Sequence, residues 1–276
     1  MKRVLVMGAS GRVGAYLRQF WPGTGVDPLW QFRADAPDGA LLWNPLSDAV
    51  PECGPVDAVL CLAGVTTGKD LGLNTDLALA ALRAAQRLGA GRVLLASSVA
   101  VYGADPGPHS EQGPCLPAND YGRAKLAMEQ VARENAGGLE LCALRIGNIA
   151  GADALLGGLR AGVKPRLHRF PDGSAPRRAY LGPETLARIL SHLVCCQTAL
   201  PSVLNIAQPG LVGMDALLRA AGQNWDWVTA PDTAVPELRL NLARQQSLYP
   251  LPEATPEALV AEWRLTWAAT RRTDSI

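Results

Sequence analysis

The sequence has little of what marks several large classes of protein. Its 276 residues carry a formal net charge of only +1, with a pI near 7.6, which disfavours a general role on nucleic acid or at a membrane surface. No segment approaches the roughly 20 apolar residues that a membrane helix requires. The first apolar run, residues 4–7, is too short for the core of a signal peptide. We therefore expect a soluble cytoplasmic protein that binds neither nucleic acid nor a membrane.

Cysteines with metal-ligand or redox spacing are also missing. The six cysteines form no Cys-x-x-Cys pair, and Cys61 and Cys142 lie in apolar, strand-like runs. Buried, reduced thiols are therefore the expected state, and no metal site is predicted. The chain shows no internal repeat and no low-complexity tract.

What the chain does have is a large apolar fraction, 48%, arranged in a regular alternation through its first 150 residues. Strand-like runs occupy residues 4–7, 29–32, 41–43, 56–62, 92–96 and 139–146, and helical spacing marks residues 12–20, 74–88 and 121–134. Alternating strands and helices predict an α/β protein with a Rossmann-like, doubly wound parallel sheet. Such sheets bind ligands at the carboxyl ends of their strands.

The pattern loosens after about residue 150. A stretch rich in Gly, Pro and Arg, residues 151–176, predicts loop with short helical pieces; helices over 183–196, 215–221 and 255–267 and a strand over 202–206 follow. We expect residues 1–150 to form a dinucleotide-binding core. Residues 151–276 would form a small C-terminal substrate lobe, with about 179–210 returning to the core.

A glycine motif, Gly8-x-x-Gly11-x-x-Gly14, follows the first strand and opens the first helix. In that setting Gly8 allows the tight turn, Gly11 lets backbone approach a phosphate, and Gly14 lets the helix pack on the strand. The helix N-terminus supplies N–H donors and partial positive charge for a pyrophosphate. Dinucleotide binding is predicted here, and Ser10, Arg12 and Val13 would share in it.

The end of the second strand bears on the choice of dinucleotide. An acid there would accept from the ribose 2′-hydroxyl of NAD, but the run ends in Arg33 and no acid occurs before Asp35. Arg33, with help from Arg12, could instead face a 2′-phosphate. NADP is therefore the expected cofactor, with NAD as the alternative.

Three residues suggest proton transfer at a carbonyl or carbinol. Tyr121 and Lys125 are four apart and share a helix face, and Ser98 ends a strand 23 residues upstream. A nearby ammonium lowers the pKa of a phenol, so Tyr121 could act as general acid and base. Ser98 could donate to the same substrate oxygen.

The motifs Ser97-Ser98-x-x-Val101-Tyr102-Gly103 and Tyr121-x-x-x-Lys125, in this order after the glycine turn, resemble the extended short-chain dehydrogenase/reductase superfamily, specifically its NAD-dependent epimerase/dehydratase family. The resemblance implies that Ser98 rather than Ser97 is catalytic. It also implies that Lys125 grips the cofactor ribose, and that Asn74 orders the catalytic helix; a plain N-cap is the other interpretation of Asn74.

The same resemblance implies further contacts. Cofactor positions are Asn44, Leu46, Leu62, Ala63, Gly64, Ala96 and Ile146, and substrate positions are Ser98, Val99, Asn148 and Arg178. Six basic residues and one acid between 160 and 178 give a local excess of +5, which suits an anionic substrate. Arg178 would grip a phosphate bidentately.

The expected function is that of an NAD(P)-dependent oxidoreductase moving a hydride between nicotinamide and a sugar-like or nucleotide-sugar carbonyl or carbinol. A nucleotide-sugar 4-epimerase with tightly bound NAD is the alternative, and a non-catalytic NAD(P) sensor is the second. A dehydratase is disfavoured, because Val99 and Ala100 stand where dehydratases of this family carry Asp-Glu. The resemblance further implies a homodimer.

Overall fold

The computed structural model describes residues 1–273, and its side chains to residue 266. The chain forms two compact units. The first comprises Met1–Gly103, Cys115–Arg145 and Ala187–Leu204, and the second comprises Ala104–Pro114, Ile146–Leu186 and the described residues from Asn205 onward.

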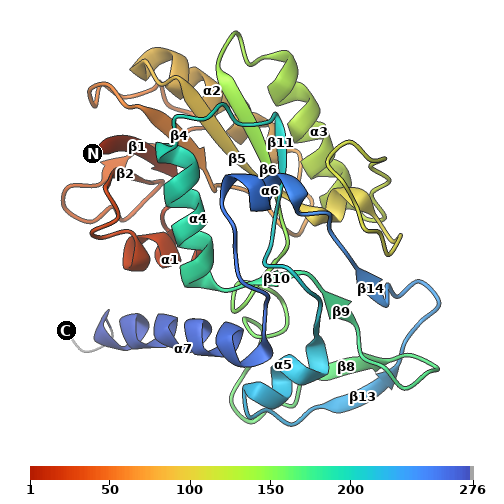
Figure 1. Ribbon diagram of the computed structural model, residues 1–276. Helices are drawn as coiled ribbons and strands as arrows, with labels where there is room; N and C mark the ends of the chain where they lie inside the picture. The colour runs from red at the N-terminus through yellow and green to blue at the C-terminus, as the bar shows by residue number, and fades with distance from the viewer. Residues whose placement is uncertain (274–276) are drawn as a thin grey trace. The chain divides into compact units, whose positions relative to one another are not determined.

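A seven-stranded parallel sheet organises the first unit, in the order β11-β6-β5-β4-β1-β2-β3 (Figure 1). Its strands are β1 (Lys2–Met7), β2 (Val26–Phe32), β3 (Leu41–Leu42), β4 (Ala58–Cys61), β5 (Arg92–Ser98), β6 (Glu140–Ile146) and β11 (Val203–Ile206). After β1, β2 and β3 the chain crosses back over the sheet to β4. Strands β1 and β4 are therefore neighbours, although two strands separate them in sequence. The expected doubly wound, Rossmann-like sheet is confirmed.

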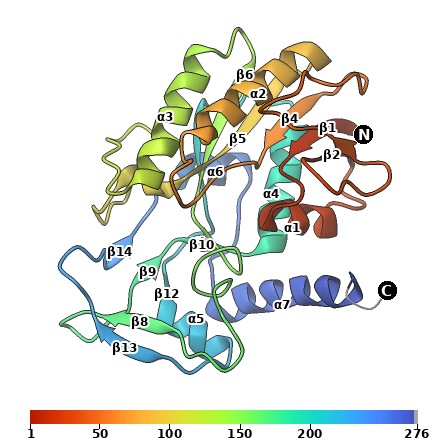
Figure 2. The same cartoon turned by 180° about the vertical axis from the view of Figure 1, so that it is seen from behind.

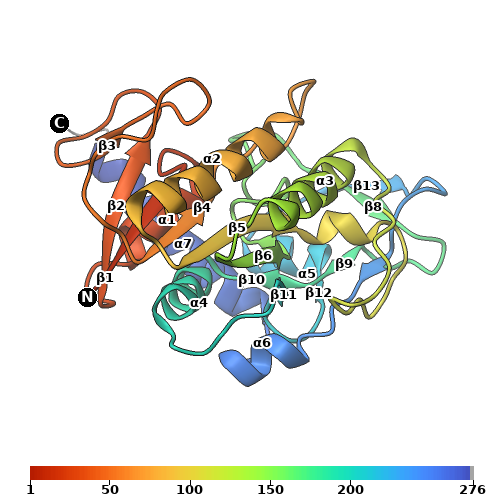
Figure 3. The ribbon, with the colours of Figure 1, turned by 90° about the horizontal axis from the view of Figure 1, so that it is seen from above.

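Helices cover both faces of this sheet. The long helices α2 (Leu73–Leu88) and α3 (Asp120–Glu134) lie side by side on one face, as Figures 2 and 3 show, whereas α1 (Arg12–Phe20) and α4 (Pro183–Cys195) lie on the other. Alternate strand residues such as Leu5, Val59 and Val93 point toward the α2 face and are fully buried. The many alanines of α2 pack against them, which brings that helix close to the sheet.

The second unit has a core of its own, built around Leu156, Leu167, Tyr180, Leu217 and Trp263. Its elements are β7 (Asn148–Ile149), β8 (Arg166–Arg169), β9 (Arg177–Arg178), β10 (Tyr180–Leu181), β12 (Val212–Gly213), α5 (Met214–Ala220), β13 (Asp226–Thr229), β14 (Glu237–Leu238), α6 (Ala243–Leu248) and α7 (Pro256–Thr273). The expectation of loop and helical pieces over 151–176 was wrong in one respect, because β8 forms there and pairs in parallel with β13. Among the described residues, no helix is both long and apolar enough to cross a membrane.

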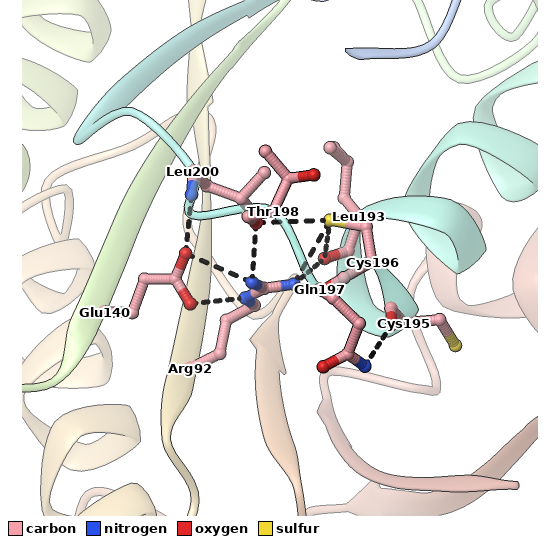
Figure 4. Close-up of polar contacts among 8 residues, drawn as sticks. All are labelled: Arg92, Glu140, Leu193, Cys195, Cys196, Gln197, Thr198 and Leu200. Carbon is pink, nitrogen blue, oxygen red and sulfur yellow. Dashed lines mark hydrogen bonds and ion pairs between the residues drawn. The ribbon is translucent and has the colours of Figure 1, made fainter.

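The last turn of α4 is capped by a side chain from the sheet (Figure 4). Arg92 Nη1 donates to the carbonyls of Leu193 and Cys196 at 2.7 and 2.8 Å, and Nη2 donates to the carbonyl of Thr198 at 3.0 Å. Glu140 holds the same guanidinium through bonds of 2.8 and 3.1 Å. Arg92 thus satisfies carbonyls that a helix end leaves without intrahelical partners.

Replacing Arg92 with Met should therefore destabilise the protein by about 3 kcal/mol, since several carbonyls and the Glu140 carboxylate lose their donor at once. Thermal melting measures the effect. Arg87→Met is the matched control, because the Arg87–Glu52 pair is exposed, with side chains 62% and 87% accessible. Equal melting temperatures for the two variants would show that the cap contributes nothing.

Candidate active site

The glycine turn has the geometry that its motif predicts. Gly8 has a φ of +86°, and a Cβ there would lie 2.6 Å from the backbone nitrogen of Ala63. A Cβ at Gly14 would lie 2.5 Å from the Gly8 carbonyl oxygen, so that position also needs glycine. Gly11 is the N-cap of α1, and no side chain caps the helix. The N–H groups of its first turn are therefore available to donate to a ligand at the exposed Ser10–Arg12 segment.

At the end of β2, a buried glutamine joins three strands. Gln31 Oε1 accepts from the Gly8 N–H at 2.9 Å, and its Nε2 donates to the carbonyl of Trp43 at 2.6 Å. The next residue, Phe32, is buried under the guanidinium of Arg18, which lies 5.4 Å from the ring centroid. The end of β2 therefore carries an aromatic side chain and no carboxylate.

The predicted residues around an adenosine lie at the surface of the first unit. Arg33 and Asp35 are exposed, and Asp35 adopts a φ of +50°. Asn44 turns the chain after β3, since its Oδ1 accepts from the backbone N–H of Leu46 at 3.2 Å. Leu46 is 39% exposed, so its apolar side chain is available to cover a planar ligand.

Ser98 and Tyr121 meet at the carboxyl end of β5. The Ser98 hydroxyl accepts from the N–H of Ala100 at 3.2 Å and thereby caps the short helix η1 (Val99–Tyr102). The Ser98 hydroxyl lies close enough to the Tyr121 phenol to lower its pKa. Asn119 caps α3 through a 2.8 Å bond from the Gly122 N–H, which fixes the first turn of the helix that carries Tyr121. Two hydroxyls can therefore address one substrate oxygen.

Lys125 lies one helical turn after Tyr121 on α3 and is only 4% exposed. Its Nζ donates to the carbonyl of Ala96 at 2.8 Å and lies 6.0 Å from the centroid of the Tyr121 ring. Burial lowers the pKa of Lys125 to about 8, and the neighbouring Cys61 and Glu129 oppose that shift.

The expected effect of Lys125 on Tyr121 does not appear. Burial raises the pKa of the Tyr121 phenol, and the opposing influence is the hydrogen bond from Ser98 rather than the ammonium. The physical reason is that the Lys125 ammonium donates to the backbone at Ala96 and lies beside the ring, not at the phenol oxygen.

Asn74 links α2 to the loop after β4. Its Oδ1 accepts from the N–H of Val65 at 3.2 Å, and its Nδ2 donates to the carbonyls of Val65 and Leu71 at 2.9 and 2.8 Å. The N-cap of α2 is Gly72, so the interpretation of Asn74 as a plain N-cap is wrong. A Cβ at Gly64 would lie 2.8 Å from Asn74 Oδ1 and 3.1 Å from Lys125 Nζ, which places all three residues together.

The remaining predicted cofactor residues follow strand ends. Leu62 and Ala63 come directly after β4, and the N–H groups of both donate to the Met7 carbonyl, at 2.9 and 3.1 Å. Ile146 ends β6 and is 7% exposed, and Val99 is 8% exposed at the start of η1. These two apolar side chains present little surface to a ligand.

The two substrate residues predicted beyond residue 146 belong to the second unit. Asn148 and Tyr180 are register partners of β7 and β10, and Asn148 lowers the pKa of the Tyr180 phenol against the effect of burial. The Tyr180 hydroxyl donates to Asp153 Oδ2 at 2.8 Å, and burial raises the pKa of that carboxyl. Asn148 is therefore a strand residue beside a buried tyrosine rather than a residue of a turn.

Arg178 keeps an unneutralised charge. Its guanidinium donates to the carbonyls of Arg177, Val235 and Pro236, at 2.8, 2.8 and 3.2 Å, and burial lowers its pKa. Within the described part of the chain no carboxylate forms an ion pair with it. By contrast, Glu237 lies outside residues 160–178 but pairs with Arg177 at 2.9 Å. The net positive charge around this stretch is therefore smaller than the excess of +5 counted from its sequence.

Sequence reasoning missed a buried cluster behind Ser98. Glu129 and Arg145 form an ion pair of 2.7 Å, and Ser97 and Tyr102 bond to it. The available signal was spacing, because Glu129 lies four residues after Lys125 on the same helix face.

Fold and site together define a dinucleotide-binding Rossmann protein with the Ser, Tyr and Lys of short-chain dehydrogenases and reductases. A profile of the NAD dependent epimerase/dehydratase family matches residues 4–167, which is more than half of the chain. The chain belongs to this family.

Two curated relatives are UDP-glucose 4-epimerases. The protein of Azospirillum brasilense is 34% identical over 174 residues, 55% of this chain and 50% of that protein. The protein of Lacticaseibacillus casei is 38% identical over 82 residues, 29% of this chain and 25% of that protein. The matched region thus spans half or less of the length of these relatives.

Solved structures share the fold along nearly the whole chain. MoeE5, in complex with UDP-glucuronic acid and NAD, superposes with a TM-score of 0.80 at 22% identity, covering 97% of this chain and 99% of that one. UDP-glucose 4-epimerase from Bifidobacterium longum, in complex with NAD⁺ and UDP, gives 0.77 at 18% identity over 98% and 99%. At these identities the likeness shows the fold alone.

Proposed function

We propose that the protein is a nucleotide-sugar 4-epimerase that uses NAD. The observation that carries the proposal is that the Ser98 hydroxyl acts on the Tyr121 phenol while Lys125 Nζ lies 6.0 Å from the centroid of the Tyr121 ring. The names of both curated relatives support epimerisation. The expectation that net reduction is favoured over epimerisation loses support, because no feature of the site selects it.

The proposed residues divide the work at the sugar C4 oxygen. Tyr121 Oη takes the hydroxyl proton when C4 is oxidised and returns it when C4 is reduced on the opposite face. Ser98 Oγ donates to the same oxygen and holds it beside Tyr121. Lys125, fixed by the Ala96 carbonyl, would hold the ribose hydroxyls of the cofactor. That Asn148 and Arg178 bind substrate stays a prediction for the second unit.

The chain fits a nicotinamide dinucleotide at the glycine turn. The uncapped N-terminus of α1, with glycines at positions 8 and 14 that admit no Cβ, is a cradle for a pyrophosphate. The turn, Gly64 and Lys125 would hold the group, which supplies the hydride acceptor and donor when bound. NAD is proposed because MoeE5 and the Bifidobacterium longum epimerase are described with NAD. The other cofactor, NADP bound through Arg33, stays a prediction from the sequence. The homodimer and the cytoplasmic location also stay predictions.

Two measurements on the purified protein test the proposal. Mass analysis of the denatured protein should release NAD close to one per chain, and UDP-glucose and UDP-galactose should interconvert without added cofactor, as followed by NMR. Stoichiometric consumption of added NADPH, with no interconversion, would replace the epimerase by a net reductase. Retention of NAD(P) without any turnover would favour the second alternative, a non-catalytic NAD(P) sensor.

A further inference from the structure

A buried ion pair lies behind the residue proposed to hold the substrate oxygen. Arg145 Nη2 donates to Glu129 Oε2 at 2.7 Å, and Arg145 Nε lies 3.1 and 3.2 Å from the two carboxylate oxygens. The two side chains are 4% and 0% exposed. Removing both charges from water costs several kcal/mol, so an apolar pair of similar volume would serve stability as well or better. The pair therefore requires an explanation other than stability.

The ion pair reaches both ends of the segment that carries Ser98. On the near side, the Ser97 hydroxyl donates to Glu129 Oε1. On the far side, Arg145 Nη1 donates to the Tyr102 hydroxyl at 3.1 Å, and the guanidinium lies over the Tyr102 ring, 4.9 Å from its centroid. Ser98 and the first three residues of η1, Val99–Val101, lie between these two anchors.

We propose that Glu129 and Arg145 are positioning residues that fix the Ser97–Tyr102 segment, and with it the hydroxyl of Ser98 against Tyr121. The inference rests on the proposed function for the role of Ser98. Glu129 serves this end from α3 itself, one turn after Lys125, so a single buried carboxylate ties β5 to the helix that carries Tyr121. Such an anchor controls the position of the Ser98 hydroxyl. That position matters because a shift of about 1 Å at a catalytic group can cost ~10²-fold in rate.

Two conservative variants test the anchors without breaking the ion pair. Ser97→Ala and Tyr102→Phe each remove one hydroxyl, so we expect kcat to fall by roughly 10-fold or more while KM and the melting temperature stay near the wild-type values. Ser191→Ala is the matched control. It removes the hydroxyl of a buried serine on α4, outside the cluster, and should keep the wild-type kcat.

A second readout needs no substrate. Because the bond from Ser98 lowers the pKa of Tyr121 against the effect of burial, a displaced Ser98 should raise the alkaline midpoint of Tyr121. The chain has five tyrosines. Ultraviolet titration of Ser97→Ala minus Ser97→Ala/Tyr121→Phe isolates Tyr121, and wild type minus Tyr121→Phe is the reference.

Wild-type kcat in both variants, with an unchanged Tyr121 midpoint, would overturn the positioning role. If the wild-type protein converts no nucleotide sugar, the proposed function fails, and the titration still decides this inference. A raised Tyr121 midpoint in Ser97→Ala then supports it, and an unchanged midpoint refutes it.

Discussion

Tyr121→Phe is expected to abolish turnover, with kcat at least ~10³-fold below wild type, because general acid–base catalysis by one positioned group contributes about 10²–10⁴-fold. The substitution removes only the phenol hydroxyl, whose pKa Ser98 lowers, and leaves the ring beside Lys125. Packing and the dinucleotide cradle are therefore preserved. The measurement is the rate of UDP-glucose and UDP-galactose interconversion, together with melting temperature and NAD content.

The matched control for this prediction is Tyr249→Phe. Tyr249 is the C-cap of α6 in the second unit, so the change removes a phenol hydroxyl far along the chain from the catalytic motifs. We expect wild-type rates from it. Substantial turnover by Tyr121→Phe would remove Tyr121 from the chemistry and, with it, the assigned mechanism.

Local signals were sufficient to predict the first unit. The helix predicted over 12–20 is α1 with the same bounds, and the helix predicted to end before Gly89 ends there, with Gly89 at a φ of +73°. The strands were found from short apolar runs because both faces of the sheet are covered by helices. Each of these signals lies in, or directly beside, the helix or strand that it predicts.

The second unit was harder because its strands are specified by distant partners. Only one residue of β8, Leu167, is apolar and buried, and the strand exists by pairing with β13, whose residues lie 60 positions later. Strands β7 and β10 have two residues each, which is too short for a periodicity. Pairing of this kind leaves no pattern in the segment itself.

The candidate site shows the same division. Ser98, Tyr121 and Lys125 were predicted because each belongs to a motif with fixed spacing. The bonds from Glu129 and Arg145 to the Ser98 segment were not, since they join α3, β5 and β6 through single side chains. That Lys125 lowers the pKa of Tyr121 stays a prediction, and the bond from its ammonium to the backbone carbonyl of Ala96 left no pattern in the sequence.

Gly64→Ala should have the other large effect, although it adds a single methyl group to a residue that takes no part in proton transfer. The new Cβ would lie 2.8 Å from Asn74 Oδ1 and 3.1 Å from Lys125 Nζ. Asn74 cannot yield freely, since three hydrogen bonds hold its side chain and it is 1% exposed. Either the Val65 loop or the Lys125 ammonium must move.

Both displacements damage the site, so we expect kcat to fall by ~10²-fold or more and the NAD retained through purification to decrease. Gly72→Ala is the matched control. Gly72 lies nearby in sequence, has helical φ and ψ of −59° and −28°, and has no atom within 4 Å of an added Cβ. That variant should keep its activity with little change in melting temperature, because the more restricted unfolded chain offsets the loss of glycine at the N-cap. If Gly64→Ala behaves like Gly72→Ala in kcat and NAD content, then Asn74 and Lys125 do not depend on the close approach of this loop, and their placement must be fixed from the helices alone.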